Sequence, residues 1–257
     1  MDIKKQVLQQ FGQHASKYVS SQTHAKGKDL DLLVMLALSE NHSSVLDIAT
    51  GGGHVANALA PYAKHIVAYD MTPEILASAE SFITGNGHQH IQFVEGDAEK
   101  LPFADHSFDI ITCRIAAHHF PDVHSFIQES YRVLKRNGRL LIIDNVAPES
   151  DLLDQFYNTV EKKRDPSHNR AFKKGEWMYF LESSGFTIES MYTFPKTFAF
   201  DEWFKRMGQS DQVRQELTQL MLEASYDTQH YFRIQTSKQQ IISFRGQSAL
   251  IQAKKEV

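Results

Sequence analysis

The chain has 257 residues, of which 42% are hydrophobic and 23% are charged, the balance of an ordinary globular protein. Its formal net charge of −4 argues against a nucleic-acid binder, because such surfaces need an excess of basic residues. The single cysteine excludes an internal disulfide and any paired-cysteine zinc motif, so no metal is expected.

The N-terminal region carries no targeting signal that we recognise. Its first residues lack the apolar core of a secretory signal, and the longest apolar run in the chain, residues 32–38, is far shorter than the roughly 18 residues of a membrane helix. We therefore expect a cytoplasmic protein with no integral membrane segment. Residues 1–40 are predicted to form an amphipathic helical cap ahead of one domain, residues 41–257.

Short apolar runs alternate with helical patterns through the middle of the chain. Helical spacing of apolar residues at 55–62 follows the first of these runs, and Thr72-Pro73 is typical of a helix start. Alternation of this kind favours parallel strands with helices on both faces of the sheet. Strands are expected at residues 44–49, 65–70, 90–95, 108–113 and 139–145.

The pattern changes after residue 146. Residues 150–184 are helical with a polar break at 164–169, a strand is expected at 187–198, and further helices at 202–207 and 212–225. The tail, residues 231–254, is rich in β-forming residues and predicts an antiparallel hairpin at the sheet edge. The whole pattern predicts an α/β, Rossmann-like, seven-stranded, mostly parallel sheet with helical lid insertions near 150–172 and 200–228. One predicted helical stripe belongs to the lid or to core packing: Leu217, Leu220, Met221 and Ala224.

Glycines follow the first predicted strand, where ligands bind in open α/β sheets. Gly51 and Gly53 allow the backbone to turn sharply and approach a ligand. Asp70 ends the second strand, and a carboxylate there matches the two hydroxyls of a ribose. These features predict a nucleotide-containing cofactor without specifying which one.

Two cofactor classes satisfy this pattern. The spacing Gly51-x-Gly53-x-x-Ala56 also fits the dinucleotide fingerprint, so an NAD(P)-dependent oxidoreductase remains open. Asp97 and Ala98, at the end of the third strand, would instead recognise the edge of an adenine base through a carboxylate and a backbone N–H. The apolar residues 101–103 would cover that base.

Several linked blocks of this sequence together resemble the class I S-adenosylmethionine-dependent methyltransferases. The resemblance covers roughly residues 11–146, and the most similar branch holds the ubiquinone/menaquinone-pathway C-methyltransferases and related small-molecule enzymes. Ala49 departs from the family, which usually has glycine there, and cofactor binding is expected to survive this change. The blocks are residues 45–53, 68–71, 96–103, 107–111 and 131–140.

The resemblance implies a role for each matching residue of the cofactor site. Asp47 and the turn from Ala49 to Gly53 would surround the methionine part of S-adenosylmethionine, and Asp70 would hold its ribose. Met71 would lie against the adenine, whose edge Asp97 and Ala98 would bind. Arg114 would meet the methionine carboxylate, with a surface salt bridge as the alternative. Asp109 is expected to be structural.

The acceptor side is expected just after the fourth strand. His118 and His119 would either accept a proton from the acceptor or only line its pocket, since histidine titrates near neutral pH. His168 in the predicted lid insertion would contact the acceptor, although a solvated loop is the simpler interpretation. Tyr18 would close over the cofactor or pack as an ordinary core residue.

We therefore expect a methyltransferase that uses S-adenosylmethionine and a small-molecule acceptor, with no nucleic acid as partner. An NAD(P)-dependent oxidoreductase and a non-catalytic cofactor-binding protein are the alternatives. Neither the methylated atom nor the oligomeric state follows from the sequence.

Overall fold

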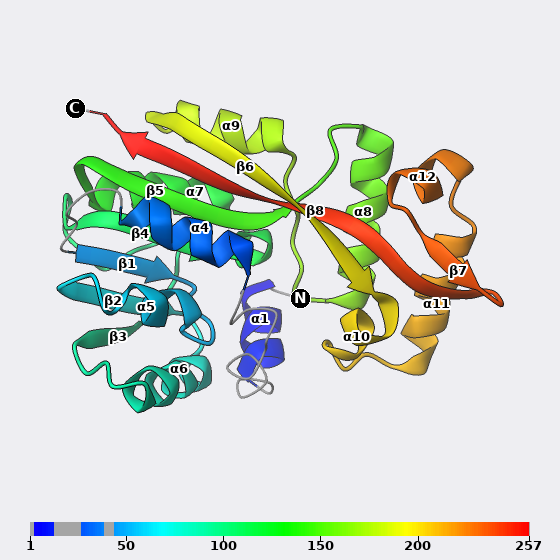
Figure 1. Cartoon of the computed structure of the whole chain (residues 1–257), viewed down its shortest axis with the longest axis horizontal. Helices are drawn as coiled ribbons and strands as arrows, with labels where there is room; N and C mark the ends of the chain where they lie inside the picture. The colour runs from blue at the N-terminus through cyan, green and yellow to red at the C-terminus, as the bar shows by residue number, and fades with distance from the viewer. Residues whose placement is uncertain (1–2, 13–26, 39–43, 257) are drawn as a thin grey trace.

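One twisted sheet forms the centre of the protein (Figure 1). The computed structural model of the chain describes residues 3–12, 27–38 and 44–256. The strand order is β3-β2-β1-β4-β5-β8-β6, with β7 paired to β8, and the first five strands are parallel. The predicted Rossmann-like fold is thus confirmed, with a short eighth strand added. The strands are β1 (Ser44–Ile48), β2 (His65–Asp70), β3 (Ile91–Glu95), β4 (Phe108–Arg114), β5 (Leu134–Val146), β6 (Phe186–Ala199), β7 (Gln235–Ser237) and β8 (Gln240–Lys255).

The C-terminal part of the sheet corrects one detail of the prediction. The predicted antiparallel C-terminal hairpin forms, but its main strand does not lie at the sheet edge, because β8 is one long strand that lies between β5 and β6 and pairs antiparallel with both. The hairpin joins β7 to β8 through Lys238 and Gln239, which both have positive φ. The interior place of β8 agrees with its buried apolar run from Ala249 to Ile251.

Helices cover both faces of the parallel part of the sheet. Successive strand residues point to opposite faces, so Val45 packs into one core cluster and Leu46 into the other. The Val45 side includes side chains of α4 (Lys28–Ala37), α5 (His54–Leu59) and α6 (Pro73–Gly85), and the Leu46 side includes those of α7 (Val123–Val133) and α9 (Lys174–Ser183).

A second group of helices lies beyond the carboxyl end of β5. It consists of α8 (Asp151–Arg164), α10 (Phe200–Lys205), α11 (Asp211–Leu222) and α12 (Tyr226–Tyr231). Figure 1 shows β6 and β8 running from the main sheet into this group. In the predicted lid stripe, Leu217 and Met221 are fully buried against Trp203 of α10, so the stripe is core packing of the insertion.

Within its described residues, the predicted N-terminal cap contains two helices with different surroundings. Leu30 and Leu33 of α4 belong to the sheet's own core cluster, so α4 is part of the main fold. The other helix, α1 (Ile3–Gly12), lies beside the carboxyl ends of the strands (Figure 1). Within the described residues, no helix combines the length and the apolar character that crossing a bilayer requires.

The turn between β1 and α5 depends on glycine, which yields a stability prediction. Gly53 has φ +78°, and an added Cβ would approach Ile83 Cδ1 to 2.8 Å. We expect Gly53→Ala to lower the free energy of unfolding in urea by about 1–3 kcal/mol, because the left-handed region and the close contact both oppose a side chain. The control is Gly85→Ala at the exposed end of α6, where nothing lies within 4 Å, and it should raise stability by about 0.4–1 kcal/mol. Equal stabilities of the two variants would contradict this account of the turn.

Candidate functional site

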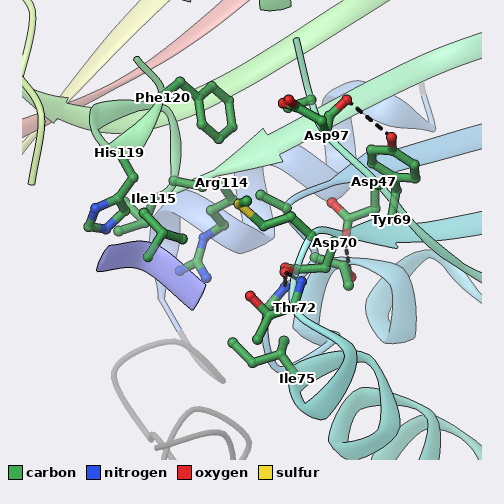
Figure 2. Close-up of a pocket in the computed structure, with 18 of the residues that line it drawn as sticks. Asp47, Tyr69, Asp70, Thr72, Ile75, Asp97, Arg114, Ile115, His119 and Phe120 are labelled. Carbon is green, nitrogen blue, oxygen red and sulfur yellow. Dashed lines mark hydrogen bonds between the residues drawn. The ribbon is translucent and has the colours of Figure 1, made fainter. Parts of the chain in front are cut away.

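A pocket of about 1040 Å³, including its part open to solvent, lies at the carboxyl ends of β1, β2 and β4 (Figure 2). Ligands are expected at this edge of an open α/β sheet. Of the residues predicted from the sequence, Gly53, His118 and His168 are not among its lining residues. Those that line it are Asp47, Ala49, Gly51, Asp70, Met71, Asp97, Ala98, Arg114 and His119.

The turn after β1 forms one wall of this pocket. Ala49 has φ 53° and Gly51 has φ 55°, so both occupy the left-handed region. Glycine adopts this region without strain and alanine does not, which is a physical reason for the glycine that the family resemblance implies at position 49. Asp70 braces the turn, because its carboxylate accepts hydrogen bonds from the N–H groups of Gly51 at 3.1 Å and Thr72 at 3.0 Å.

Asp47 is a buried carboxylate beneath the same turn. The hydroxyl groups of Thr50 and Thr112 donate to its two oxygens at 2.6 and 2.7 Å. Burial raises the pKa of Asp47 to about 6, although these hydroxyl donors oppose the shift. Burial raises the pKa of Asp70 as well. Both carboxylates would therefore be stabilised by a positively charged ligand.

Asp97, which is predicted to bind the edge of the adenine base, contacts the N-terminal helix. Lys4 of α1 donates to Asp97 at 2.6 Å and also contacts Glu99. The Tyr69 hydroxyl donates to the backbone oxygen of Asp97 at 3.1 Å, as Figure 2 shows. Lys4 and Val7 both line the pocket, so α1 forms part of its wall.

Arg114 combines the two alternatives considered from the sequence. It lines the pocket, and its guanidinium is paired with Asp29 of α4 at 2.8 Å. Its side chain is only 6% exposed, so this pair is not a surface salt bridge. Asp109, at the other end of β4, accepts from the backbone N–H of Ser44 at 2.9 Å and so ties β4 to β1, in line with a structural role.

His118 and His119 lie in a 3-10 turn, η1 (Ala117–His119), after β4. The Nδ1 of His118 is 2.6 Å from Asp144 Oδ1 of β5, and both side chains are buried. Burial alone would lower the pKa of His118, but the charge of Asp144 outweighs it and the pKa lies above its usual range. The same contact holds the pKa of Asp144 below its usual range, against the effect of burial. The raised pKa of His118 and the lowered pKa of Asp144 both favour the ionic form of the pair.

The pKa values of the two neighbouring histidines, His119 and His168, are lowered instead. Burial and the adjacent charge of His118 lower the pKa of His119 to about 4, and the same two causes lower the pKa of His168. The ring centroid of His118 lies 4.1 Å from that of His119 and 5.5 Å from that of His168. Three histidines from two segments thus meet, and His118 alone among them has a pKa above its usual range.

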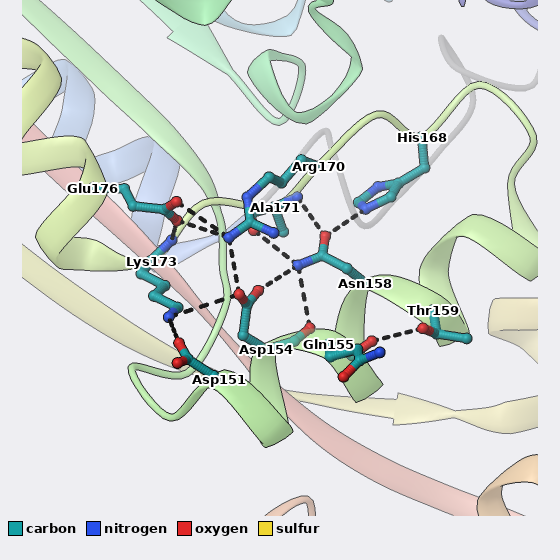
Figure 3. A network of polar contacts seen from close by, with 10 residues as sticks. All are labelled: Asp151, Asp154, Gln155, Asn158, Thr159, His168, Arg170, Ala171, Lys173 and Glu176. Atoms are coloured by element: carbon teal, nitrogen blue, oxygen red, sulfur yellow. Dashed lines mark hydrogen bonds and ion pairs between the residues drawn. The ribbon is translucent and has the colours of Figure 1, made fainter.

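The polar break at residues 164–169 is not the solvated loop that the sequence favoured. His168 is 3% exposed and Ser167 is fully buried. Figure 3 shows the reason: the side-chain oxygen of Asn158 on α8 accepts from His168 Nε2 at 3.0 Å and from the Ala171 N–H at 2.8 Å. Hydrogen bonds to α8 replace those to water, so a polar sequence can be buried here.

Sequence reasoning missed the groups that organise these histidines. Asp144 ends the apolar run 140–143 of β5, and a lone acid at the carboxyl end of a buried strand is a signal that was available. Asn158 gave no such signal, because its role depends on where the chain returns after α8. Tyr18 lies outside the described residues. In the part of the chain that the structure describes, no group of three or more histidine, cysteine or acidic side chains is arranged to hold a metal ion.

The buried histidines predict how stability depends on pH. Since native His168 has a lowered pKa, the unfolded chain takes up a proton below about pH 6.5 that the native state does not, and this lowers stability as the pH falls. Replacing His168 with glutamine should remove up to about 1.4 kcal/mol per pH unit from the slope of unfolding free energy against pH between 5 and 6. Urea unfolding from pH 5 to 8 measures both slopes, which should coincide above pH 7.5. Parallel curves at pH 5–6 would contradict the buried, neutral state of His168.

Comparison with known proteins agrees with the fold. Residues 46–142 match the model of the methyltransferase domain family. The uncharacterised methyltransferase YcgJ of Bacillus subtilis is 38% identical over 94% of this chain and 96% of its own length. A crystal structure of a methyltransferase candidate from Bacillus halodurans is 49% identical, covers 90% of this chain and all of that one, and superposes with a TM-score of 0.88.

A further relative is named for the biosynthetic pathway in which it acts. The ubiquinone/menaquinone biosynthesis C-methyltransferase UbiE of Rickettsia prowazekii is 30% identical over 65% of this chain and 68% of its own length. The family model covers the strands that build the pocket, and YcgJ matches nearly the full length of the chain. This chain therefore belongs to the class I methyltransferase family.

Proposed function

We propose that the protein transfers a methyl group from S-adenosylmethionine to a small-molecule acceptor. The observation that carries this proposal is the charge of the pocket. Its lining contains four carboxylates, and both basic side chains among the described lining residues are engaged in ion pairs. The carboxylates are Asp47, Asp70, Asp97 and Glu99.

This charge distribution separates the two cofactor classes. S-adenosylmethionine carries a positive sulfonium and a positive ammonium group, and buried carboxylates favour both. A nicotinamide dinucleotide carries a pyrophosphate, which would have to approach Asp47 and Asp70 without a free cation among the described lining residues. The pocket therefore supports the methyltransferase reading over the oxidoreductase.

The residues around the pocket suggest how the cofactor lies. Asp70 would accept from the ribose hydroxyls, and Met71 and Ala98 would pack against the adenine. Asp97 would accept from the adenine amine once it loosens its contact with Lys4. Asp47 and the Ala49–Gly53 turn would surround the methionine end. These roles follow family resemblance and pocket position together.

The main contribution of the protein to this reaction is to align the acceptor with the methyl group. Methyl transfer is an in-line displacement with a good leaving group, so holding the acceptor opposite the sulfur atom supplies much of the rate. Ile115, Phe120 and Pro121 form an apolar stretch of the lining after β4. This surface supports a small, partly apolar acceptor, and UbiE is named for the biosynthesis of such molecules, ubiquinone and menaquinone.

Cofactor choice is tested by titration calorimetry with S-adenosylhomocysteine, NAD and NADP. We expect S-adenosylhomocysteine to bind and the dinucleotides to give no heat of binding, because the carboxylate-lined pocket repels a pyrophosphate. Binding of NAD(P) without a response to S-adenosylhomocysteine would refute the proposal. Transfer of labelled methyl groups to any member of an acceptor panel separates an enzyme from a non-catalytic binder.

A second test uses the pKa of Asp47, which is about 6 in the ligand-free protein. A cationic ligand favours the ionised carboxylate, so binding below pH 6 must expel a proton. The affinity for S-adenosylhomocysteine, which keeps the ammonium group, should fall by up to about tenfold per pH unit between pH 6 and 5. Asp47→Asn should bind more weakly at pH 7 and lose this part of the pH dependence. The same pH dependence in both proteins would place the ammonium group away from Asp47.

A further inference from the structure

The turn after β4, which holds His118 and His119, makes a buried contact with the loop after α8, residues 165–171. We propose that His119 is the general base for the acceptor, that the 165–171 loop positions it, and that the His118–Asp144 ion pair keeps its ring neutral. Such a base implies an acceptor that bears a weakly acidic hydroxyl group. The inference rests on the proposed function, because it assigns the proton that methyl transfer releases.

The position of the proton on His119 follows from its partner. The Nδ1 atom lies 3.0 Å from the backbone oxygen of Ser167, which can only accept, so Nδ1 carries the hydrogen. In the neutral ring Nε2 is then the basic nitrogen, on the ring edge that points away from the loop. His119 is also the one member of the histidine trio that lines the pocket. His119 therefore presents a defined tautomer beside the pocket.

The loop that supplies Ser167 is held firmly against the β4 turn. The N–H groups of Asn169 and Arg170 both donate to the backbone oxygen of His118, at 2.8 and 3.0 Å. The side-chain amide of Asn169 donates to the Phe120 oxygen at 2.7 Å. Ser167 is fixed in turn by Asp165, whose Oδ1 accepts from its N–H at 2.9 Å and from its hydroxyl.

A second layer fixes the same loop to α8. Figure 3 shows the Asn158 side chain between α8 and residues 168–171, with its amide nitrogen donating to Asp154 Oδ1 at 2.6 Å and to the Ala171 oxygen at 3.1 Å. Arg170 pairs with Asp154 at 2.8 Å and with Glu176 at 3.1 Å. Asn158 and Asp165 are therefore positioning residues for the base.

The charged groups around His119 determine its protonation. The ring centroid of His118 lies 4.1 Å from that of His119, and His118 is paired with Asp144 of β5. The negative charge of Asp165 in the loop acts in the opposite direction and raises the pKa of His119. His168 is a further titratable neighbour among the described residues, and burial and the charge of His118 lower its pKa, which favours the neutral ring. Among these charged groups His118 has the largest effect on the pKa of His119, and it opposes a second proton on that ring. The base is consequently available well below neutral pH.

The proton transfer balances as follows. A bond forms between the methyl carbon and the nucleophilic atom of the acceptor, either its hydroxyl oxygen or a ring carbon conjugated with it. The carbon–sulfur bond breaks, and its electron pair neutralises the sulfonium to give S-adenosylhomocysteine. The hydroxyl proton passes to His119 Nε2. Positive charge develops on the acceptor as the new bond forms, so its hydroxyl becomes acidic enough for this weak base.

Histidine NMR tests the charge assignment in the ligand-free protein. In uniformly 15N-labelled protein at pH 6, long-range proton–nitrogen spectra should show His118 protonated on both nitrogens and His119 on Nδ1 alone. Asp144→Asn is nearly isosteric and removes the carboxylate, so His118 should lose its extra proton. The titration midpoint of His119 should then rise by about one to two pH units. His118→Gln should move it in the same direction, and His119→Gln assigns the signals.

Kinetics tests the chemical role with saturating S-adenosylmethionine and a panel of phenols, quinols and amines. His119→Gln should lower kcat about 10²-fold on a hydroxyl acceptor while the affinity for S-adenosylhomocysteine stays unchanged. For Asp144→Asn, the ratio of wild-type to variant kcat should grow as the pH falls from 7.5 to 5. A purely structural role would lower kcat by one factor at every pH.

Several outcomes would overturn the inference. These are a proton on His119 Nε2, an unchanged His119 midpoint in folded Asp144→Asn, full activity of His119→Gln, or turnover of amines alone. Circular dichroism and thermal unfolding confirm that each variant is folded. Calorimetry with S-adenosylhomocysteine keeps the two proposals apart: binding with a failed histidine test refutes only this inference, and no binding refutes the proposed function.

Discussion

Two buried carboxylates at neighbouring strand ends hold the backbone that the rest of the site depends on. Asp47 accepts from Thr50 and Thr112, and Asp70 accepts from the backbone of Gly51 and Thr72. These bonds keep the turn after β1 in left-handed geometry even where an alanine stands at position 49. Burying two acids close together is unfavourable without a compensating cation. A cationic cofactor would therefore stabilise this arrangement of the turn.

The acceptor side uses the opposite arrangement of charge. There the buried charges already compensate one another, because His118 and Asp144 form an ion pair within the protein. The pair leaves its two histidine neighbours neutral, which suits a surface that must take up a proton. The proposed cofactor wall is thus acidic and favours a cationic ligand. On the proposed acceptor wall, the charges of His118 and Asp144 balance each other.

The two walls come from different parts of the chain and are joined by the long C-terminal strands. The cofactor wall belongs to the parallel half of the sheet, and the loop that holds His119 belongs to the helical insertion. Strands β6 and β8 pair over most of their length and extend from the main sheet into that insertion (Figure 1). Continuous pairing of this kind resists bending, so the insertion keeps a defined position over the β4 turn.

The sequence by itself determined the parallel half of the fold and pointed to the residues proposed to bind the cofactor, because local signals carry both. Strand–helix alternation implies right-handed crossovers, and these place Asp47, Asp70 and Asp97 at one edge of the sheet. Tertiary structure alone decided the place of β8, since its two neighbours are remote in the chain. It also decided the acceptor wall: the polar residues 164–169 predict a solvated loop until Asn158 and the β4 turn supply their hydrogen bonds. A buried polar segment depends on partners distant in the sequence, and no local pattern encodes them.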